Sequence, residues 1–146
     1  MHLVRRCTLF LSTLLLPLLL NSAVGRADLV DAGYRTKISC PEKKPWTEKF
    51  KGYLKDGSDK RYSGVLGEYY SHDLAIKLSA SGQLDYNWRI TQQKPGKRKD
   101  YWKLRTRQKI ANGDTRLTFK AYFYFTGVRD RTPCSIDIVF DRAPVR

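Results

Sequence analysis

The chain has 146 residues, of which 28 are Lys or Arg and 14 are Asp or Glu, so its formal net charge is +14. This length suffices for one domain and is too short for two, and a hydrophobic content of 41% excludes a chain that is disordered by composition. The strong positive charge favours a protein that meets an acidic partner.

Residues 1–26 have the layout of a secretory signal peptide. A basic start is followed by an apolar, Leu-rich run from Cys7 to Leu20 and then by small residues. The alternative is an uncleaved membrane anchor, but this run has about 14 residues and a spanning helix needs about 20. We expect cleavage near Gly25 or Ala27, which leaves a secreted domain over residues 27–146 with a net charge of +11 and without a transmembrane segment.

The first elements of this domain are one strand with a weaker pattern than the later ones and one ambiguous segment. Apolar and polar side chains alternate over residues 34–40, as in a strand with one buried face. Residues 46–54 carry aromatic and Leu side chains at helical spacing, and Pro45 precedes them. Gly52 disfavours a helix by about 1 kcal/mol, and a short strand over residues 49–55 also fits. We keep the short helix and the strand as alternatives.

A period of two on both sides of Ala80-Ser81-Gly82 predicts a β-hairpin with a three-residue turn and Gly82 in the left-handed conformation. The turn sets the register, and an even shift keeps the apolar side chains on one face. The predicted pairs are Leu78 with Leu84, Ile76 with Tyr86, and Leu74 with Trp88.

A second hairpin is predicted at Asn112-Gly113, since this pair suits a type I′ turn. It follows a basic loop at residues 94–99 and precedes a last strand at 134–140. The predicted register pairs Ala111 with Asp114, Trp102 with Phe123, Leu104 with Ala121, Thr106 with Phe119, and Gln108 with Leu117. We therefore expect a mainly β fold, a single antiparallel β-sandwich or half-barrel, with at most one short helix near residues 46–54.

The other face of this second hairpin is basic and aromatic. Its predicted members are Lys103, Arg105, Arg107, Lys109, Arg116, Lys120, Tyr101, Tyr122 and Tyr124. The register sets Arg105 opposite Lys120 and Lys109 opposite Arg116, and each such pair of like charges is destabilising by about 0.2–1 kcal/mol. Basic rows with aromatic neighbours suit an extended anion such as single-stranded nucleic acid, a sulfated glycan or an acidic membrane surface. The alternative is a solvated face whose charges keep strand edges from pairing.

Two cysteines, Cys40 and Cys134, remain once the leader with Cys7 is removed. In an oxidising compartment an even pair predicts a disulfide, here between residues 94 positions apart, and closing so long a loop is worth about 4.5 kcal/mol. Two buried free thiols are the alternative. With one His left in the mature chain, we expect neither a metal site nor a cofactor.

Signs of catalysis are weak. His72 and Glu68 are the only candidates for an acid–base pair, which would act on a phosphodiester with Arg side chains stabilising the charge. Asp73 would point to the opposite face of a strand from His72. No nucleophile elbow, phosphate loop or paired-carboxylate motif is present. We expect a protein that binds and does not catalyse, with a small secreted ribonuclease-like enzyme as the alternative.

A leader, a basic mature chain and one cysteine near each end, Cys40 and Cys134, give the chain a layout similar to that of small secreted effector proteins of plant-pathogenic fungi. Some of these are disulfide-stapled β-sandwiches and others are ribonuclease-like. Residues 85–90 resemble the aromatic strand of fungal ribonucleases, but Asn87 stands where the base would be, and residues 134–138 lack the expected His. The resemblance therefore implies a non-catalytic, effector- or toxin-like virulence factor.

Such a factor would act outside the producing cell on an acidic partner such as nucleic acid, a sulfated glycan or a host protein, and whether it enters a host cell is left open. A further alternative is an extracellular or periplasmic interaction domain that recognises a protein by its sheet edge.

Overall fold

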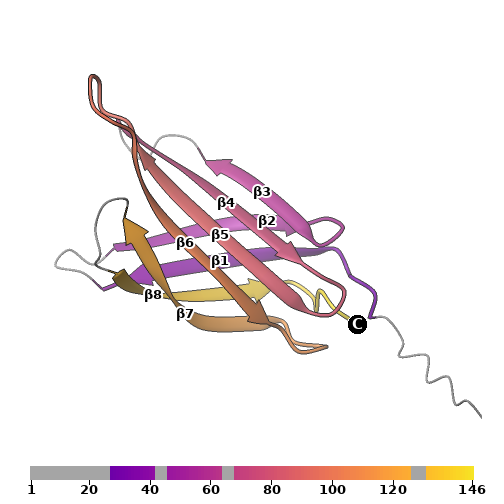
Figure 1. Cartoon of the computed structure of the whole chain (residues 1–146). Coiled ribbons are helices and arrows are strands. Elements are labelled where there is room, and N and C mark those ends of the chain that lie inside the picture. The colour runs from indigo at the N-terminus through magenta and orange to yellow at the C-terminus, as the bar shows by residue number, and fades with distance from the viewer. Residues whose placement is uncertain (1–26, 42–45, 64–67, 126–130) are drawn as a thin grey trace, which may run out of the picture.

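The computed structural model describes residues 27–41, 46–63, 68–125 and 131–146, and these contain eight β-strands and no helix (Figure 1). The predicted signal peptide at residues 1–26 lies outside the described residues. The strands are β1 (Ala32–Cys40), β2 (Trp46–Leu54), β3 (Ser58–Ser63), β4 (Tyr70–Leu78), β5 (Gln83–Gln92), β6 (Asp100–Lys109), β7 (Arg116–Phe125) and β8 (Arg131–Phe140).

All eight strands belong to one antiparallel sheet, whose order is β2-β1-β8-β7-β6-β5-β4-β3. From β3 to β8 each strand lies beside the next one in the chain, and β1 pairs with β8. The two edge strands, β2 and β3, are joined by a tight turn at which Lys55 pairs with Ser58. The sheet thus curls into a nearly closed barrel (Figure 1), and the expectation of a mainly β fold is confirmed.

The short helix considered for residues 46–54 is wrong, because this segment is strand β2 along its whole length. It pairs with β1 from Ala32–Leu54 to Cys40–Trp46. The apolar residues that look helical in spacing include Phe50 and Leu54, which a strand also places on one face, and both are buried in the barrel. The competing strand interpretation of the same residues is therefore correct.

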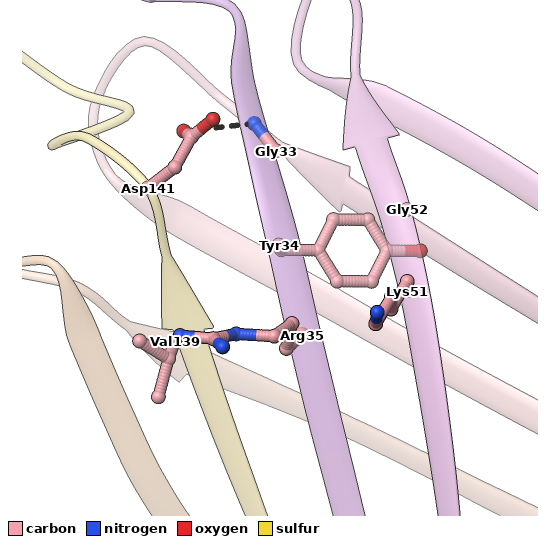
Figure 2. Close-up of a pocket in the computed structure, with 7 residues that line it drawn as sticks. All are labelled: Gly33, Tyr34, Arg35, Lys51, Gly52, Val139 and Asp141. Carbon is pink, nitrogen blue, oxygen red and sulfur yellow. Dashed lines mark hydrogen bonds between the residues drawn. The ribbon is translucent and has the colours of Figure 1, made fainter.

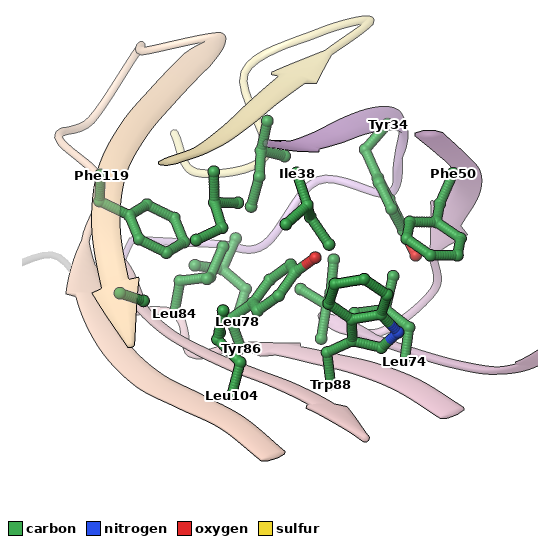
Figure 3. Packing of buried hydrophobic residues seen from close by; sticks show 14 of the residues in the cluster. Tyr34, Ile38, Phe50, Leu74, Leu78, Leu84, Tyr86, Trp88, Leu104 and Phe119 are labelled. Carbon is green, nitrogen blue, oxygen red and sulfur yellow. The ribbon is translucent and has the colours of Figure 1, made fainter. Parts of the chain in front are cut away.

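Aromatic side chains fill the middle of the barrel (Figure 3). The Trp88 ring makes edge contacts with Phe50 and Phe123, with ring centroids 5.4 and 5.0 Å apart. Tyr86 packs edge-on against Phe119 at 5.9 Å, and burial raises the pKa of the Tyr86 hydroxyl. Most of the buried side chains are the apolar members of the period-two pattern, and their burial is the main driving force for the fold.

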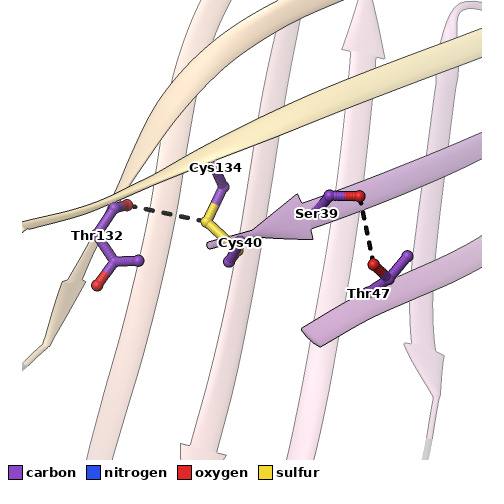
Figure 4. The surroundings of a disulfide bond; sticks show 5 residues. All are labelled: Ser39, Cys40, Thr47, Thr132 and Cys134. Atoms are coloured by element: carbon purple, nitrogen blue, oxygen red, sulfur yellow. Dashed lines mark hydrogen bonds between the residues drawn. A yellow bond between two sulfur atoms is a disulfide. The ribbon is translucent and has the colours of Figure 1, made fainter. Parts of the chain in front are cut away.

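The predicted disulfide forms between Cys40 and Cys134, which lie 94 positions apart and are both buried (Figure 4). It joins the end of β1 to β8, next to the pair of Ser39 with Ser135 in the ladder of these two strands. The bond thus fixes the contact between the first and the last strand. These two strands are neighbours in the sheet but are not joined by a short loop.

The first hairpin is confirmed in register, since β4 and β5 pair Leu78 with Leu84 and Leu74 with Trp88. Its turn also follows the prediction. Gly82 has a φ of +79°, a value that glycine adopts without strain. A local pattern and a turn of defined length were enough to fix this part of the sheet.

The second hairpin has a different register from the predicted one. The pairs formed between β6 and β7 in the described residues are Trp102 with Phe125, Lys103 with Tyr124, and Leu104 with Phe123, a shift of two residues. The turn hydrogen bond from the Asp114 amide to the Ala111 carbonyl, at 3.2 Å, does form. Near the turn, however, β6 stays with β5 and β7 stays with β8, so the two strands diverge. Because the shift is even, the same side chains still point outward.

The seam between β2 and β3 is crossed by a side chain inside the barrel. Tyr34 of β1 lies over Gly52, where any Cβ would overlap its ring (Figure 2). Its hydroxyl donates a 2.5 Å hydrogen bond to Asp59 on β3. Gly52 therefore leaves room for the Tyr34 ring, which connects β1 to β3, two strands that are not paired in the sheet.

Candidate anion-binding face

The predicted basic and aromatic residues do lie on the outer side of the barrel. Along β6 the buried side chain of Leu104 separates the exposed side chains of Lys103 and Arg105, as the alternation requires. Arg107, Lys109, Arg116 and Lys120 are also exposed. Tyr122 and Tyr124 are 51% and 45% exposed, and Tyr101 is half-buried. The prediction that these side chains share the outer face is consistent with the geometry, but their role in binding stays a prediction.

The predicted pairs of like charge, Arg105 with Lys120 and Lys109 with Arg116, do not form. Lys103 lies opposite Tyr124, and beyond Leu104 towards the turn no ladder joins β6 to β7 in the described residues. Because β6 and β7 diverge, the basic side chains of the two strands do not face each other, as the register predicted from the Asn112-Gly113 turn would require.

Two of the arginines are neutralised by carboxylates from the flanking strands. The Arg107 guanidinium meets Asp85 of β5 at 2.7 Å, and Arg116 makes two hydrogen bonds of 2.9 and 3.0 Å to Asp137 of β8. Hydrogen bonding to Arg116 holds the pKa of the Asp137 carboxyl below its ordinary value. Lys109 donates to the Ser81 carbonyl. The part of the face near the Asn112-Gly113 turn is therefore largely paired.

The opposite end of the face carries a row that runs across four strands. Cross-strand pairing aligns Arg89 of β5, Lys103 of β6, Tyr124 of β7 and Arg131 of β8, and we call these four residues the cation–aromatic row. Neither Lys103 nor Arg131 forms an ion pair within the described residues. Asp73 of β4 follows Arg89 in the register, and no ion pair joins them in that part of the chain.

Cation–π contacts organise this row. The Lys103 ammonium lies 4.4 Å from the centre of the Tyr101 ring, and the Arg89 guanidinium lies 5.9 Å from the same ring. Arg131 lies 5.0 Å from the Tyr124 ring centre. Such contacts hold cations in place without neutralising them. Arg105 and Tyr122 lie on the adjoining outer surface, and both are exposed.

Arg89 and Arg131 were missed by the sequence reasoning, which considered the two strands of one hairpin. Arg89 could have been found, because it is an outward member of the alternating segment at residues 84–90. Arg131 had no comparable pattern, since residues just before the last predicted strand were not assigned to a face.

His72 is a buried residue on the inner side of β4, at 5% exposure, and its neighbour Asp73 points outward as predicted. Trp88 donates a 3.3 Å hydrogen bond to its Nδ1 atom, and Phe50 packs at 5.1 Å between ring centres. Burial lowers the pKa of His72, and Asp73 opposes this effect. Glu68 is exposed and accepts a 2.7 Å hydrogen bond from Tyr69. His72 thus lies in the packed interior, whereas Glu68 lies in a turn at the surface.

No family model, curated protein or solved structure matches the chain. Over the described ranges, no group of three or more His, Cys, Asp or Glu side chains is placed so that it could hold a metal ion. That same part of the chain contains no helix long and apolar enough to cross a membrane.

Proposed function

We propose that this chain is a secreted, non-enzymatic binding protein, effector- or toxin-like, whose cation–aromatic row engages an acidic partner such as a nucleic acid, a sulfated glycan or a host protein. The observation that carries the proposal is the alignment of Arg89, Lys103, Tyr124 and Arg131 across four neighbouring strands. Three of these four side chains are cations, and the fourth is an exposed ring.

The spacing of the row suits an extended anion. Neighbouring strands lie about 4.8 Å apart, so the row spans roughly 14 Å from β5 to β8. A chain of phosphate or sulfate groups can meet several cations over this length, while Tyr122 and Tyr124 offer exposed rings for stacking. Cations already held against rings by cation–π contacts lose less conformational freedom when an anion binds.

The disulfide and the leader-like segment support secretion. Disulfides persist in oxidising compartments, and the bond between Cys40 and Cys134 joins the two ends of the folded domain. A binding role is supported over catalysis because His72 lies inside the barrel, where its Nδ1 atom accepts a hydrogen bond from Trp88. A general base must reach solvent or substrate to exchange its proton.

Retention on immobilised heparin and on immobilised single-stranded RNA, measured over a series of salt concentrations, tests the proposal. The test variant is Lys103→Gln/Arg131→Gln. Its matched control is Arg107→Gln/Arg116→Gln, which removes the same charge from arginines that are already paired with Asp85 and Asp137. We expect the test variant to bind at least one of the two polyanions about tenfold more weakly, and the control to bind within about twofold of wild type.

The salt dependence separates this mechanism from others. Each lost phosphate contact lowers the slope of log K against log salt by about 0.7 for a single strand, so the test variant should flatten the slope for RNA by about 1.4. Equal losses in both variants would mean that net charge alone drives retention, and unchanged retention in the test variant would remove the row as the site. Cleavage of RNA by wild type, abolished in His72→Ala, would favour the ribonuclease-like alternative.

A further inference from the structure

A shallow hollow of about 270 Å³ lies on the barrel beside β1 and β2 (Figure 2). Its lining includes Gly33, Arg35, Lys51, Val139 and Asp141. The row meets β8 at Arg131 and the hollow meets it at Val139, eight residues later, which is about 26 Å along a strand. The hollow is therefore a separate surface.

Gly33 lies at one side of the hollow and has no side chain on the outer face of β1. The space is bordered by Asp141, whose Oδ1 atom accepts a 2.9 Å hydrogen bond from the Gly33 amide. The Asp141 amide in turn donates a 2.9 Å bond to the Gly33 carbonyl. A Cβ at Gly33 would lie 2.8 Å from Asp141 Oδ2, so the carboxylate occupies the place of the missing side chain. Asp141 is thus held at one side of the hollow, and its Oδ1 atom also lies 3.7 Å from the guanidinium of Arg142.

The other side of the hollow is basic. Arg35 and Lys51 are direct cross-strand partners, and Lys37 with Lys49 form the next outward pair along the same two strands. Two adjacent pairs of like charge destabilise a sheet. Arg35 and Lys51 are exposed and form no ion pair within the described residues. Two carboxylates lie near these four bases: Asp137, which Arg116 already engages, is the cross-strand partner of Lys37, and Asp141 lines the hollow together with Arg35.

An exposed ring completes the surface. Tyr53 lies directly opposite Gly33 in the ladder and two residues after Lys51, and it is 51% exposed, so it lies next to residues that line the hollow. Val139, on the far side of Arg35, adds an apolar contact. An inorganic anion would use only the two bases. A ring of sugar size would use all parts, because its apolar face packs on an aromatic ring and its hydroxyls donate to a carboxylate.

We infer that this hollow, which we call the glycine hollow, binds one anionic sugar residue. The sulfate or carboxylate of the sugar meets Arg35 and Lys51, a hydroxyl donates to Asp141, and the apolar face of the ring packs against Tyr53. This inference goes beyond the proposed function, since none of these residues belongs to the cation–aromatic row.

Titration of the oxidised, mature protein with N-acetylglucosamine 6-sulfate, followed by amide chemical shifts, tests the inference. We expect saturable shifts at Gly33 and Gly52 with a millimolar Kd, and a Kd at least fivefold higher for N-acetylglucosamine without the sulfate. Arg35→Gln/Lys51→Gln and Tyr53→Ala should each raise the Kd at least fivefold.

The matched control is Lys37→Gln/Lys49→Gln, which removes the adjacent like-charge pair and should leave the Kd within twofold. Lys103→Gln/Arg131→Gln should also leave it unchanged, so failure of the glycine hollow and failure of the row are distinguishable. Absence of shifts at Gly33, an equal loss in the control variant, or equally tight binding of inorganic sulfate at the same amides would each overturn the inference.

Discussion

Removal of the disulfide should lower the stability of the domain by an amount that the length of the closed loop sets. Cys40 and Cys134 are 94 positions apart, and the chain-entropy relation for a loop of this size gives about 4.5 kcal/mol. The unfolding entropy of a domain of this size makes 1 kcal/mol equivalent to about 4 °C, so we expect Tm to fall by roughly 15–20 °C.

Thermal unfolding followed by circular dichroism, with and without reductant, measures this shift. The Cys40→Ala/Cys134→Ala variant serves as a second perturbation, because both sulfurs are buried and Ala avoids a buried hydroxyl. Before melting, the reduced protein should keep its β-type spectrum, since the loss arises mainly in the unfolded chain. A Tm within about 5 °C of the oxidised protein would refute the reasoning, because it would mean that the unfolded chain is not freed by cutting the bond.

Two further predictions concern the barrel interior. Burial lowers the pKa of His72 in the folded state, so the folded protein binds the proton less readily than the unfolded chain, and stability should fall as pH drops below about 6.5. Urea unfolding at pH 7.5 and 5.0 should show this loss in wild type and a smaller one in His72→Gln, and equal losses would exclude His72 as the cause. Tyr34→Phe removes the hydrogen bond to Asp59 and should cost about 1.5–3 kcal/mol by urea unfolding. A cost near zero would mean that water replaces this bond.

The first hairpin could be predicted in full because its determinants are local. Three residues of turn, a glycine in the left-handed region and a period of two on each side leave one register that buries Leu74, Ile76 and Leu78 with their partners. The cysteine pairing could be predicted because only two cysteines follow residues 1–26 in the sequence. Neither inference needs knowledge of strands elsewhere in the sheet.

The second hairpin could not be predicted because its strands have stronger partners than each other. Near the turn β6 follows β5 to the pair of Gln83 with Lys109, and β7 follows β8 from the pair of Arg116 with Val139. The turn sequence fixes a hydrogen bond between Ala111 and Asp114, but it does not fix the ladder ten residues away. Curvature of a nearly closed sheet is a property of all eight strands. The type of segment 46–54 was ambiguous for a related reason, since its pairing with β1 decides its structure.

The sequence predicted which basic side chains point outward, but not which of them lack a carboxylate partner. Which bases stay unpaired depends on the neighbouring strands, and the two acids that matter, Asp85 and Asp137, come from β5 and β8. A prediction that considers only the hairpin around Asn112-Gly113 finds no acid in its outward rows, and it therefore overestimates the positive charge near the turn. The same restriction hides Arg131, which joins Lys103 and Tyr124 only through the sheet order.

Barrel geometry also changes which pattern of bases can serve one ligand. Along a strand, outward side chains are about 6.7 Å apart, and across strands they are about 4.8 Å apart, so charges can be placed more densely across strands than along one. Along β6 only part of the row of outward bases is free of partners, since Arg107 pairs with Asp85 and Lys109 donates to the Ser81 carbonyl. Across β5 to β8 the row of Arg89, Lys103 and Arg131 contains no carboxylate. A polyanion that crosses the strands therefore meets more unneutralised charge per unit length than one that follows β6, and substitutions in the row should weaken its binding more than substitutions along the strand.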